Sequence, residues 1–353
     1  MNNRKSLLIS VIISLVVVFP LFSGGAQEGS EEKADMIYTM KISHAGPVSD
    51  LNDDYVGAKS IKDYVEEKSD GRIMVEIYSG SQLGNYQEVM EQVDNGTLEV
   101  AHTSIGGVTP FIPELAVVDL QYMIPGDEVV VELMDGPFFD EMSEAVQGKL
   151  PNVKLVGVCD GGRWRSFYTT KKAIFTAADL KGLKIRTINS PLQQEFTRQL
   201  GASATPVAWG EVYTALASEL VVGLKIATPD IMSNNFDESI RFGTLDRHTF
   251  LFGFYWISDS WLSELPDDLQ QVVMNGIEYG TDQQTTFNQN REAEANKEFV
   301  AGGGQIHELT DAERATFLPA RDAMMEWYKE KYGEKWLNSL QDAIGLAEET
   351  AGK

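Results

Sequence analysis

The sequence predicts an α/β fold with mainly parallel sheets and helices on both faces. One observation is that residues 36–103 alternate between strand-like and helix-like spacing of apolar side chains. A second is that residues 183–206 repeat the order strand, helix, strand. Successive units of this kind join parallel strands through a helix. A third is one helical stretch, residues 266–300, which would extend about 50 Å and is longer than one such unit requires.

Two strand–helix–strand units begin the chain. Residues 36–43, 72–78 and 98–103 alternate as strands, and residues 53–68 and 86–94 have helical spacing. The apolar positions of the first helix are Tyr55, Ala58, Ile61 and Val65.

The loops that follow these strands are the expected ligand crevice, because ligands of such sheets bind beyond the carboxyl ends of the strands. Residues 79–87 and 103–107 occupy those positions. Some polar side chains there are candidate contacts, although surface or capping roles explain each of them equally well: His44, Gln82, Glu88 and Thr103.

A further unit follows near the middle of the chain. Residues 176–179 have the spacing of a capping box, and residues 183–187 then alternate as a strand. Arg186 lies on the face of that strand opposite its apolar side chains. Ser190 and Pro191 have the order of an N-cap and a first helical residue, and Gly201 ends the helix.

The long helix of residues 266–300 begins at Pro266-Asp-Asp-Leu and is mostly polar. Gly276 and Gly280 could allow it to bend. Gly302-Gly-Gly304 ends it.

The N-terminus has the pattern of a secretory signal peptide. A basic start, an apolar run over residues 7–22 and a small-residue end predict a signal over residues 1–26, cleaved after Ala26. Residues 27–35 are small and polar and read as a flexible leader. The alternative is an uncleaved anchor helix over residues 6–22, which is near the lower length limit for a membrane span.

The formal charge of the chain is −24, and about −26 once the predicted signal is removed. Such a surface argues against nucleic acid and anionic lipid as partners. Salt screens the charge beyond about 8 Å, so it does not prevent local arginines from binding an anion. The single cysteine, Cys159, follows a short apolar run and is predicted to be buried and unreactive.

Few patterns in the sequence could carry catalysis. The four histidines lack metal-ligand spacing, and neither a nucleophile elbow nor a phosphate-binding glycine loop occurs. We therefore expect no metal, no cofactor and no enzymatic activity.

Several segments together resemble the solute-binding proteins of TRAP transporters, of the DctP type. The resemblance covers roughly residues 36–340. Its motifs are 71–84, 95–99, 179–186, 200–202 and 206–216, the last reading Pro206-Val-Ala-Trp-Gly-Glu-Val-Tyr-Thr-Ala-Leu216.

This resemblance implies a two-lobe fold like that of periplasmic binding proteins, with a hinge and one long helix bracing both lobes. We expect lobe I over residues 36–162, with about 251–290 returning to it. Lobe II is expected over residues 163–250, with about 291–345 returning to it.

The resemblance also implies which residues bind the ligand. The arginine of the motif, Arg186, anchors a carboxylate there, because a guanidinium offers two parallel charge-assisted hydrogen bonds. Arg165 is the expected second contact, whereas Arg163 is expected to be surface charge. Trp209 is expected to form a pocket wall, although burial in the lobe core would also explain it.

One segment departs from the family pattern. Where the family has Asp, Glu and Asn, this chain has Val222, Lys225 and Ile226. Val222 and Ile226 in place of the family's aspartate and ligand-bonding asparagine, with Trp209 as a wall, predict a more apolar contact, and hence a hydrophobic monocarboxylate. Lys225, if it turned inward, would instead favour a dicarboxylate.

The expected function is an extracytoplasmic binding protein, a monomer in the periplasm, that closes on a small organic acid and delivers it to the TRAP membrane permease. Two alternatives remain: a receptor that feeds a sensor protein, and an enzyme on a similar two-lobe scaffold.

Overall fold

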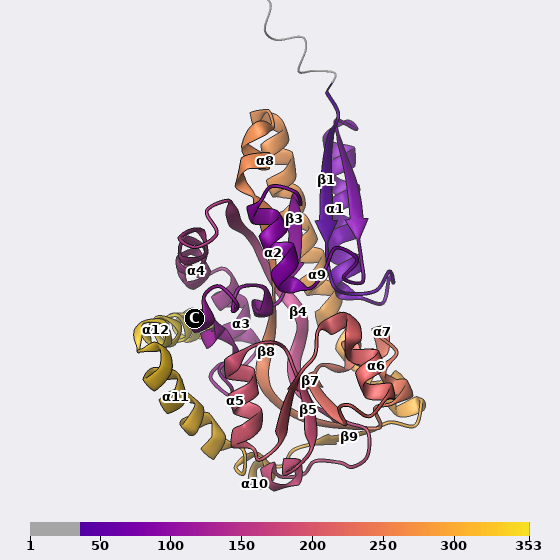
Figure 1. The fold of residues 1–353 in the computed structure, drawn as a ribbon, viewed down its shortest axis with the longest axis vertical. Coiled ribbons are helices and arrows are strands. Elements are labelled where there is room, and N and C mark those ends of the chain that lie inside the picture. The colour runs from indigo at the N-terminus through magenta and orange to yellow at the C-terminus, as the bar shows by residue number, and fades with distance from the viewer. Residues whose placement is uncertain (1–35, 353) are drawn as a thin grey trace, which may run out of the picture. The chain divides into compact units, whose positions relative to one another are not determined.

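A nine-stranded mixed sheet runs through the part of the chain that the structure, a computed structural model, describes, which is residues 36–352 (Figure 1). The strand order is β2-β1-β3-β8-β4-β7-β5-β6, and β9 pairs with β8. The strands are β1 (Tyr38–Ser43), β2 (Ile73–Tyr78), β3 (Val100–Thr103), β4 (Val153–Thr169), β5 (Lys184–Thr187), β6 (Ser203–Pro206), β7 (Gly223–Ile226), β8 (Phe242–Ser258) and β9 (Gln305–Glu308).

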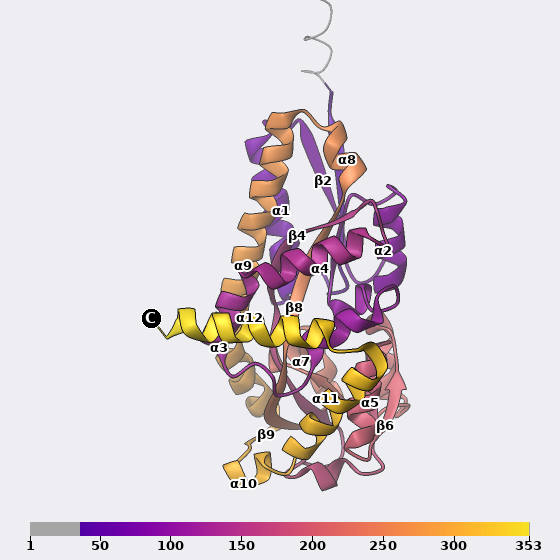
Figure 2. The ribbon, with the colours of Figure 1, turned by 90° about the vertical axis from the view of Figure 1, so that its left-hand side faces the viewer.

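Helices cover this sheet on its faces and edges (Figures 1 and 2). They are α1 (Asp53–Lys68), α2 (Tyr86–Asp94), α3 (Asp127–Met134), α4 (Pro137–Gln147), α5 (Pro191–Gln199), α6 (Val212–Ala217), α7 (Thr228–Ser233), α8 (Asp259–Glu264), α9 (Asp267–Ala301), α10 (Asp311–Arg314), α11 (Leu318–Tyr332) and α12 (Lys335–Ala351).

The two ends of the sheet are parallel and its centre is antiparallel. Strand β1 pairs in parallel with β2 and β3, and β5 with β6 and β7, as the strand–helix–strand units predicted. The central strands β8 and β4 pair antiparallel with each other and with their outer neighbours β3 and β7. The sequence analysis did not predict this centre, because the pairing of two strands about ninety residues apart leaves no local signal.

Strands β4 and β8 are both 17 residues long and connect the two parallel groups. Their pairing is interrupted by register shifts, one of them between Asp160 and Trp164. The expected lobe boundaries at residues 162–163 and 250–251 fall inside these strands, and the boundary at 290–291 falls inside α9. The lobe assignments stay predictions.

The elements that the sequence analysis predicted from local signals are present in the structure. Helices α1 and α2 have the predicted bounds, and Ser190 caps α5 as expected. The capping box at Thr176 and Asp179 forms, but around a short 3-10 helix. The predicted signal and leader, residues 1–35, lie outside the described residues.

Helix α9 is 35 residues long and packs against α1 and β4 (Figure 2). The two glycines expected to bend it have a different role. A Cβ at Gly276 would lie 2.5 Å from Cγ2 of Val65, and one at Gly280 would overlap Ile61. Both glycines therefore let α1 approach α9 closely. Gly302 is the C-cap, as predicted.

Apolar side chains from the central strands fill the core. Phe252, Phe254, Tyr255 and Trp256 of β8 are all buried. Cys159 of β4 is also buried, as predicted, and burial raises the pKa of its thiol well above the usual range. Across residues 36–352, none of the helices combines the length and hydropathy that a membrane span needs.

Candidate functional site

One cavity collects the side chains that the sequence analysis selected. Its volume open to the centre of a water molecule is about 50 Å³. The ends of β5 and β7, the middle of β4 and the starts of α1, α2 and α7 contribute to it. The lining residues are Asn52, Asp54, Tyr86, Ser104, Gly161, Arg165, Arg186, Thr187, Ile188, Gln193, Trp209, Lys225, Ile226, Asp230 and Leu251.

Arg186 is a buried cation without a carboxylate partner among residues 36–352. Its residue surface is 4% exposed, and Nε donates a hydrogen bond of 3.0 Å to the carbonyl of Val207. No described residue accepts from its two terminal amino groups. The pKa of Arg186 is lowered to about 10, mainly by burial; Tyr86 opposes this shift and Arg165 adds to it. The guanidinium stays charged at neutral pH, and Arg186 lines the cavity with two terminal amino groups that have no acceptor among the described residues.

Arg165 reaches the cavity from β4 and is held by a carboxylate behind it. Its Nη1 lies 2.8 Å from Oδ1 of Asp119, and both side chains are buried. The second oxygen of Asp119 accepts a hydrogen bond of 2.9 Å from Gln193. The charge of Arg165 is therefore largely balanced, and its position is fixed by this pair.

Lys225 also lines the cavity, from β7. Its Nζ donates to the carbonyl and to Oε1 of Gln193, at 3.0 and 2.6 Å, and to Thr197. No carboxylate within the described chain forms an ion pair with it. Burial, with the positive charge of Arg165 acting in the same direction, lowers the pKa of Lys225 well below its ordinary range. Lys225 does turn inward, as the alternative in the sequence analysis required.

Apolar walls lie beside these cations. Cζ of Arg186 lies 5.4 Å from the ring centre of Trp209, which also packs edge-on against Phe236. Trp209 is half-buried, so both expected roles, pocket wall and core packing, apply to it. Ile226 is buried and lines the cavity, but Val222 does not; it lies before β7, where its amide bonds Lys184.

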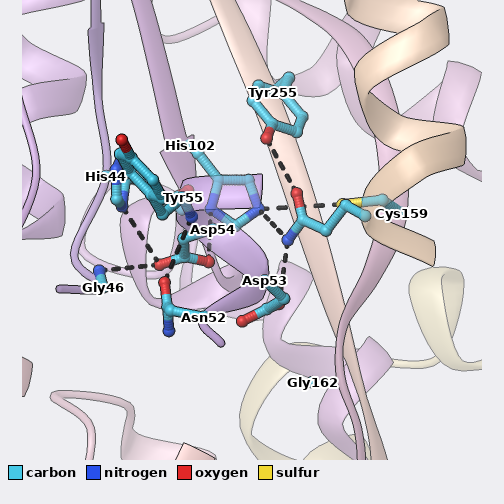
Figure 3. A network of polar contacts seen from close by, with 12 residues as sticks. His44, Gly46, Asn52, Asp53, Asp54, Tyr55, His102, Cys159, Gly162 and Tyr255 are labelled. Carbon is cyan, nitrogen blue, oxygen red and sulfur yellow. Dashed lines mark hydrogen bonds and ion pairs between the residues drawn. The ribbon is translucent and has the colours of Figure 1, made fainter. Parts of the chain in front are cut away.

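Acidic residues face the same cavity from α1 and α7. Asp54 lies 3.1 Å from Nδ1 of His102 and accepts a hydrogen bond of 2.9 Å from the amide of Gly46 (Figure 3). Burial alone would raise the pKa of Asp54, but His102 and His44 outweigh it and hold that pKa well below its usual range. Asp230 is 7% exposed, and no described residue donates to its side chain.

Behind Asp54 lies an arrangement that resembles a catalytic triad (Figure 3). Sγ of Cys159 lies 3.8 Å from Nε2 of His102, whose Nδ1 faces Asp54. The thiol is fully buried with a raised pKa and does not line the cavity. A thiol of this kind is not activated as a nucleophile.

The first-lobe candidates have mostly structural roles. His44 bonds Ser79 at 2.8 Å, and Thr103 accepts from the indole of Trp256. Glu88 completes the capping box of α2. The cavity is lined instead by Tyr86 and Ser104, which lie in the two loops predicted as the crevice, 79–87 and 103–107.

The sequence analysis predicted that Arg163 is surface charge, and this prediction is wrong. It is 8% exposed and ion-paired with Asp127, Asp160 and Glu292. Asp54 and Asp230 were not identified from the sequence, because neither belongs to a recognisable motif. Within residues 36–352, no group of three metal-ligating side chains is placed to hold a metal ion.

Comparison with known proteins supports the resemblance seen in the sequence. Residues 43–335 match the family described as bacterial extracellular solute-binding protein, family 7, or DctP. The sialic acid-binding periplasmic protein SiaP of Vibrio cholerae is 26% identical over 292 residues, 83% of this chain and 88% of that protein. The periplasmic protein YiaO of Escherichia coli, which binds 2,3-diketo-L-gulonate, is 24% identical over 274 residues, 77% of this chain and 81% of that protein.

Solved structures share the fold. The sugar acid binding protein of Advenella mimigardefordensis in complex with galactonate has a TM-score of 0.84 at 20% identity, covering 89% of this chain and 100% of that one. A TRAP periplasmic solute-binding protein of Shewanella oneidensis with bound succinate has a TM-score of 0.81 at 18% identity, covering 87% and 99%. The match to the family spans most of the chain. The members of that family are binding proteins, not enzymes. The chain therefore belongs to the DctP family of TRAP periplasmic solute-binding proteins.

Proposed function

We propose that this protein captures a small organic carboxylate in the cavity and that Arg186 is its anchor. The observation that carries the proposal is the state of Arg186: buried, charged, and without an ion-pair partner in residues 36–352. A buried charge is costly unless it is paired and hydrogen-bonded. A ligand carboxylate at the two terminal amino groups would supply both the pairing and the hydrogen bonds.

Arg165 acts in this proposal as a second donor. Asp119 occupies one of its amino groups and sets its direction, and the remaining donors face the cavity. Since Asp119 already balances the charge of Arg165, one ligand carboxylate suffices for the two arginines. The three hydrogen bonds that Nζ of Lys225 can donate already go to Gln193 and Thr197, so Lys225 has no donor left for a second carboxylate. With the charge of Arg165 balanced by Asp119, this favours a monocarboxylate over a dicarboxylate.

The body of the ligand is the less determined part. The preference for a hydrophobic body rested on Val222 and Ile226, and only Ile226 lines the cavity. Trp209 and Ile226 offer apolar surface, whereas Tyr86 and Ser104 offer hydroxyl groups. The names of two relatives state that they bind sialic acid and 2,3-diketo-L-gulonate. Two solved structures of this fold contain galactonate and succinate. A monocarboxylate that has both apolar and polar parts fits this lining best.

The protein acts outside the cytoplasmic membrane in this proposal, like the periplasmic relatives, and delivers its ligand to a TRAP permease. Closure of two lobes would exclude water from the Arg186–carboxylate pair, which strengthens it only if every hydrogen bond is made. The sensor receptor remains the second candidate. Neighbouring genes for a small and a large membrane subunit would favour transport.

Native mass spectrometry of the protein purified without refolding tests the proposal, because a tightly held ligand is carried over. A thermal-shift screen then compares three sets: hydrophobic monocarboxylates, polyhydroxylated monocarboxylates and dicarboxylates. We expect stabilisation by one or both monocarboxylate sets. Stabilisation by dicarboxylates alone would contradict the charge argument, and a response to no carboxylate would overturn the proposed function.

A further inference from the structure

Asp230 is a buried carboxyl group that lacks a donor in the part of the chain described here. Its Oδ2 is shielded from solvent and packs against Gly162, where an added Cβ would lie 2.7 Å from it. Oδ1 is not fully shielded in this way; no described residue donates to it, and Asp230 lines the cavity. Buried polar groups in folded proteins nearly always have a partner, so an exception beside a binding cavity requires an explanation.

The surroundings of Asp230 are negative. Burial raises its pKa well above the ordinary value, and the charges of Asp53 and Asp54, then of Asp160, raise it further, while Arg165 opposes. Asp54 is ionised through its contact with His102. A positive group placed at Asp230 would therefore be attracted by more than one carboxylate.

The cavity therefore contains ionisable groups of both signs. Arg186 at the end of β5 and Arg165 in β4 supply positive charge, and Asp230 in α7 and Asp54 in α1 supply carboxyl groups. A simple carboxylate would pair only with the arginines. It would leave Asp230 without a partner.

We propose that Asp230 is a second recognition point and that the ligand is a zwitterion, an organic carboxylate that also bears an ammonium group. This inference rests on the proposed role of Arg186. The carboxylate pairs with Arg186 and the ammonium pairs with Asp230. Both charges of the ligand then meet an unpaired group of opposite sign, and the buried carboxyl acquires its missing donor.

The pairing has a proton balance that can be measured. Without ligand, burial and the neighbouring carboxylates raise the pKa of Asp230 and so favour its protonated form. An ammonium ion that binds there stabilises the ionised form, so Asp230 loses its proton to the buffer while the ligand keeps its own. A hydroxyl group would bond to the protonated carboxyl, and no proton would be released.

The test uses butanoates that carry an amino group, a hydroxyl group or neither, each at the α, β or γ carbon. Affinities for the purified protein are measured by calorimetry in two buffers of different ionisation enthalpy. For at least one carbon position we expect the amino compound to bind about tenfold or more tighter than its hydroxy partner, a difference of about 1.4 kcal/mol. We also expect net proton release with the amino compound only.

Two variants locate the effect. Asp230→Asn keeps the shape of the side chain but cannot ionise, and should reduce the amino preference to within about threefold, roughly 0.7 kcal/mol. Asp342→Asn, at an exposed position of α12, should leave it unchanged. If Asp230→Asn does not fold, two measurements on the wild-type protein still test the proposal: the comparison of each amino butanoate with its hydroxy partner, and the proton release.

Equal binding of amino and hydroxy compounds at every position would overturn the zwitterion proposal. So would an amino preference that persists in Asp230→Asn. Tight binding of the hydroxy or unsubstituted butanoates with loss on Arg186→Lys would leave the proposed function standing. Absence of binding by any carboxylate would instead remove the proposed function itself.

Discussion

Replacing Arg186 by lysine tests the anchor most directly. The substitution keeps a positively charged residue type, but lysine has one nitrogen where arginine has three. In the structure Nε bonds the carbonyl of Val207 at 3.0 Å, and the two terminal amino groups remain for the ligand. Lysine cannot make both kinds of contact in the same geometry. Arg186→Lys therefore loses one charge-assisted bond to the carboxylate, or leaves the carbonyl of Val207 without its donor.

Hydrogen bonds to charged groups contribute about 1.5 to 3 kcal/mol, so we expect ligand affinity to fall roughly 10- to 100-fold. Burial adds a pH dependence. It lowers the pKa of Arg186 to about 10 and places that of the buried Lys225 well below its ordinary range. A lysine at position 186 should be affected similarly and lose its charge as the pH rises. The deficit should thus be larger at alkaline than at mildly acidic pH.

Calorimetric titration with a stabilising carboxylate from the thermal-shift screen measures the effect, and the melting temperature of the variant without ligand checks its fold. Arg198→Lys is the matched control, because Arg198 is exposed on α5 and pairs with Glu195 at the surface. An unchanged affinity in Arg186→Lys, with a normal melting temperature, would refute the anchor role. A similar loss in Arg198→Lys would point to a general charge effect.

Three further predictions concern closure, packing and pH. If two lobes hinge over the cavity, small-angle scattering should give a smaller radius of gyration with saturating ligand, and identical curves would indicate a rigid pocket. Gly280→Ala should lower stability by about 1 to 3 kcal/mol because its Cβ overlaps Ile61, whereas Gly345→Ala, with open space around it, should not; equal melting temperatures would contradict the close-packing argument. The ion pair of Asp54 and His102 should stabilise the fold most between their ordinary pKa values of 3.8 and 6.5. Asp54 has a lowered pKa in the folded protein, so its contribution is lost as the pH falls. His102 has a raised pKa, so its contribution is lost as the pH rises. Urea midpoints of wild type and His102→Gln should therefore differ more near pH 5.5 than near pH 8.5, and a constant difference would count against the pair.

The sequence alone determined the family and those elements that have strong local signals. Alternation along residues 183–187, the Ser190 cap and the helical spacing of 53–68 are local signals, and the structure has strand β5 and helices α5 and α1 there. The motif residues Arg165, Arg186, Trp209 and Ile226 were all named from the sequence, and all four line one cavity. Local patterns suffice for this much because backbone propensity and motif identity are properties of short segments.

Only the tertiary structure decided which charges meet. The antiparallel pairing of β4 with β8 sets the sheet's centre, and it joins residues about ninety positions apart. Asp230 and Asp54, far apart in the chain, face the same cavity, and Arg163 is buried among three carboxylates. Whether a charged side chain is paired, solvated or left without a partner depends on groups that other segments bring to it. Burial and pairing are therefore properties of the packed fold, and a single sequence does not contain the distances that determine them.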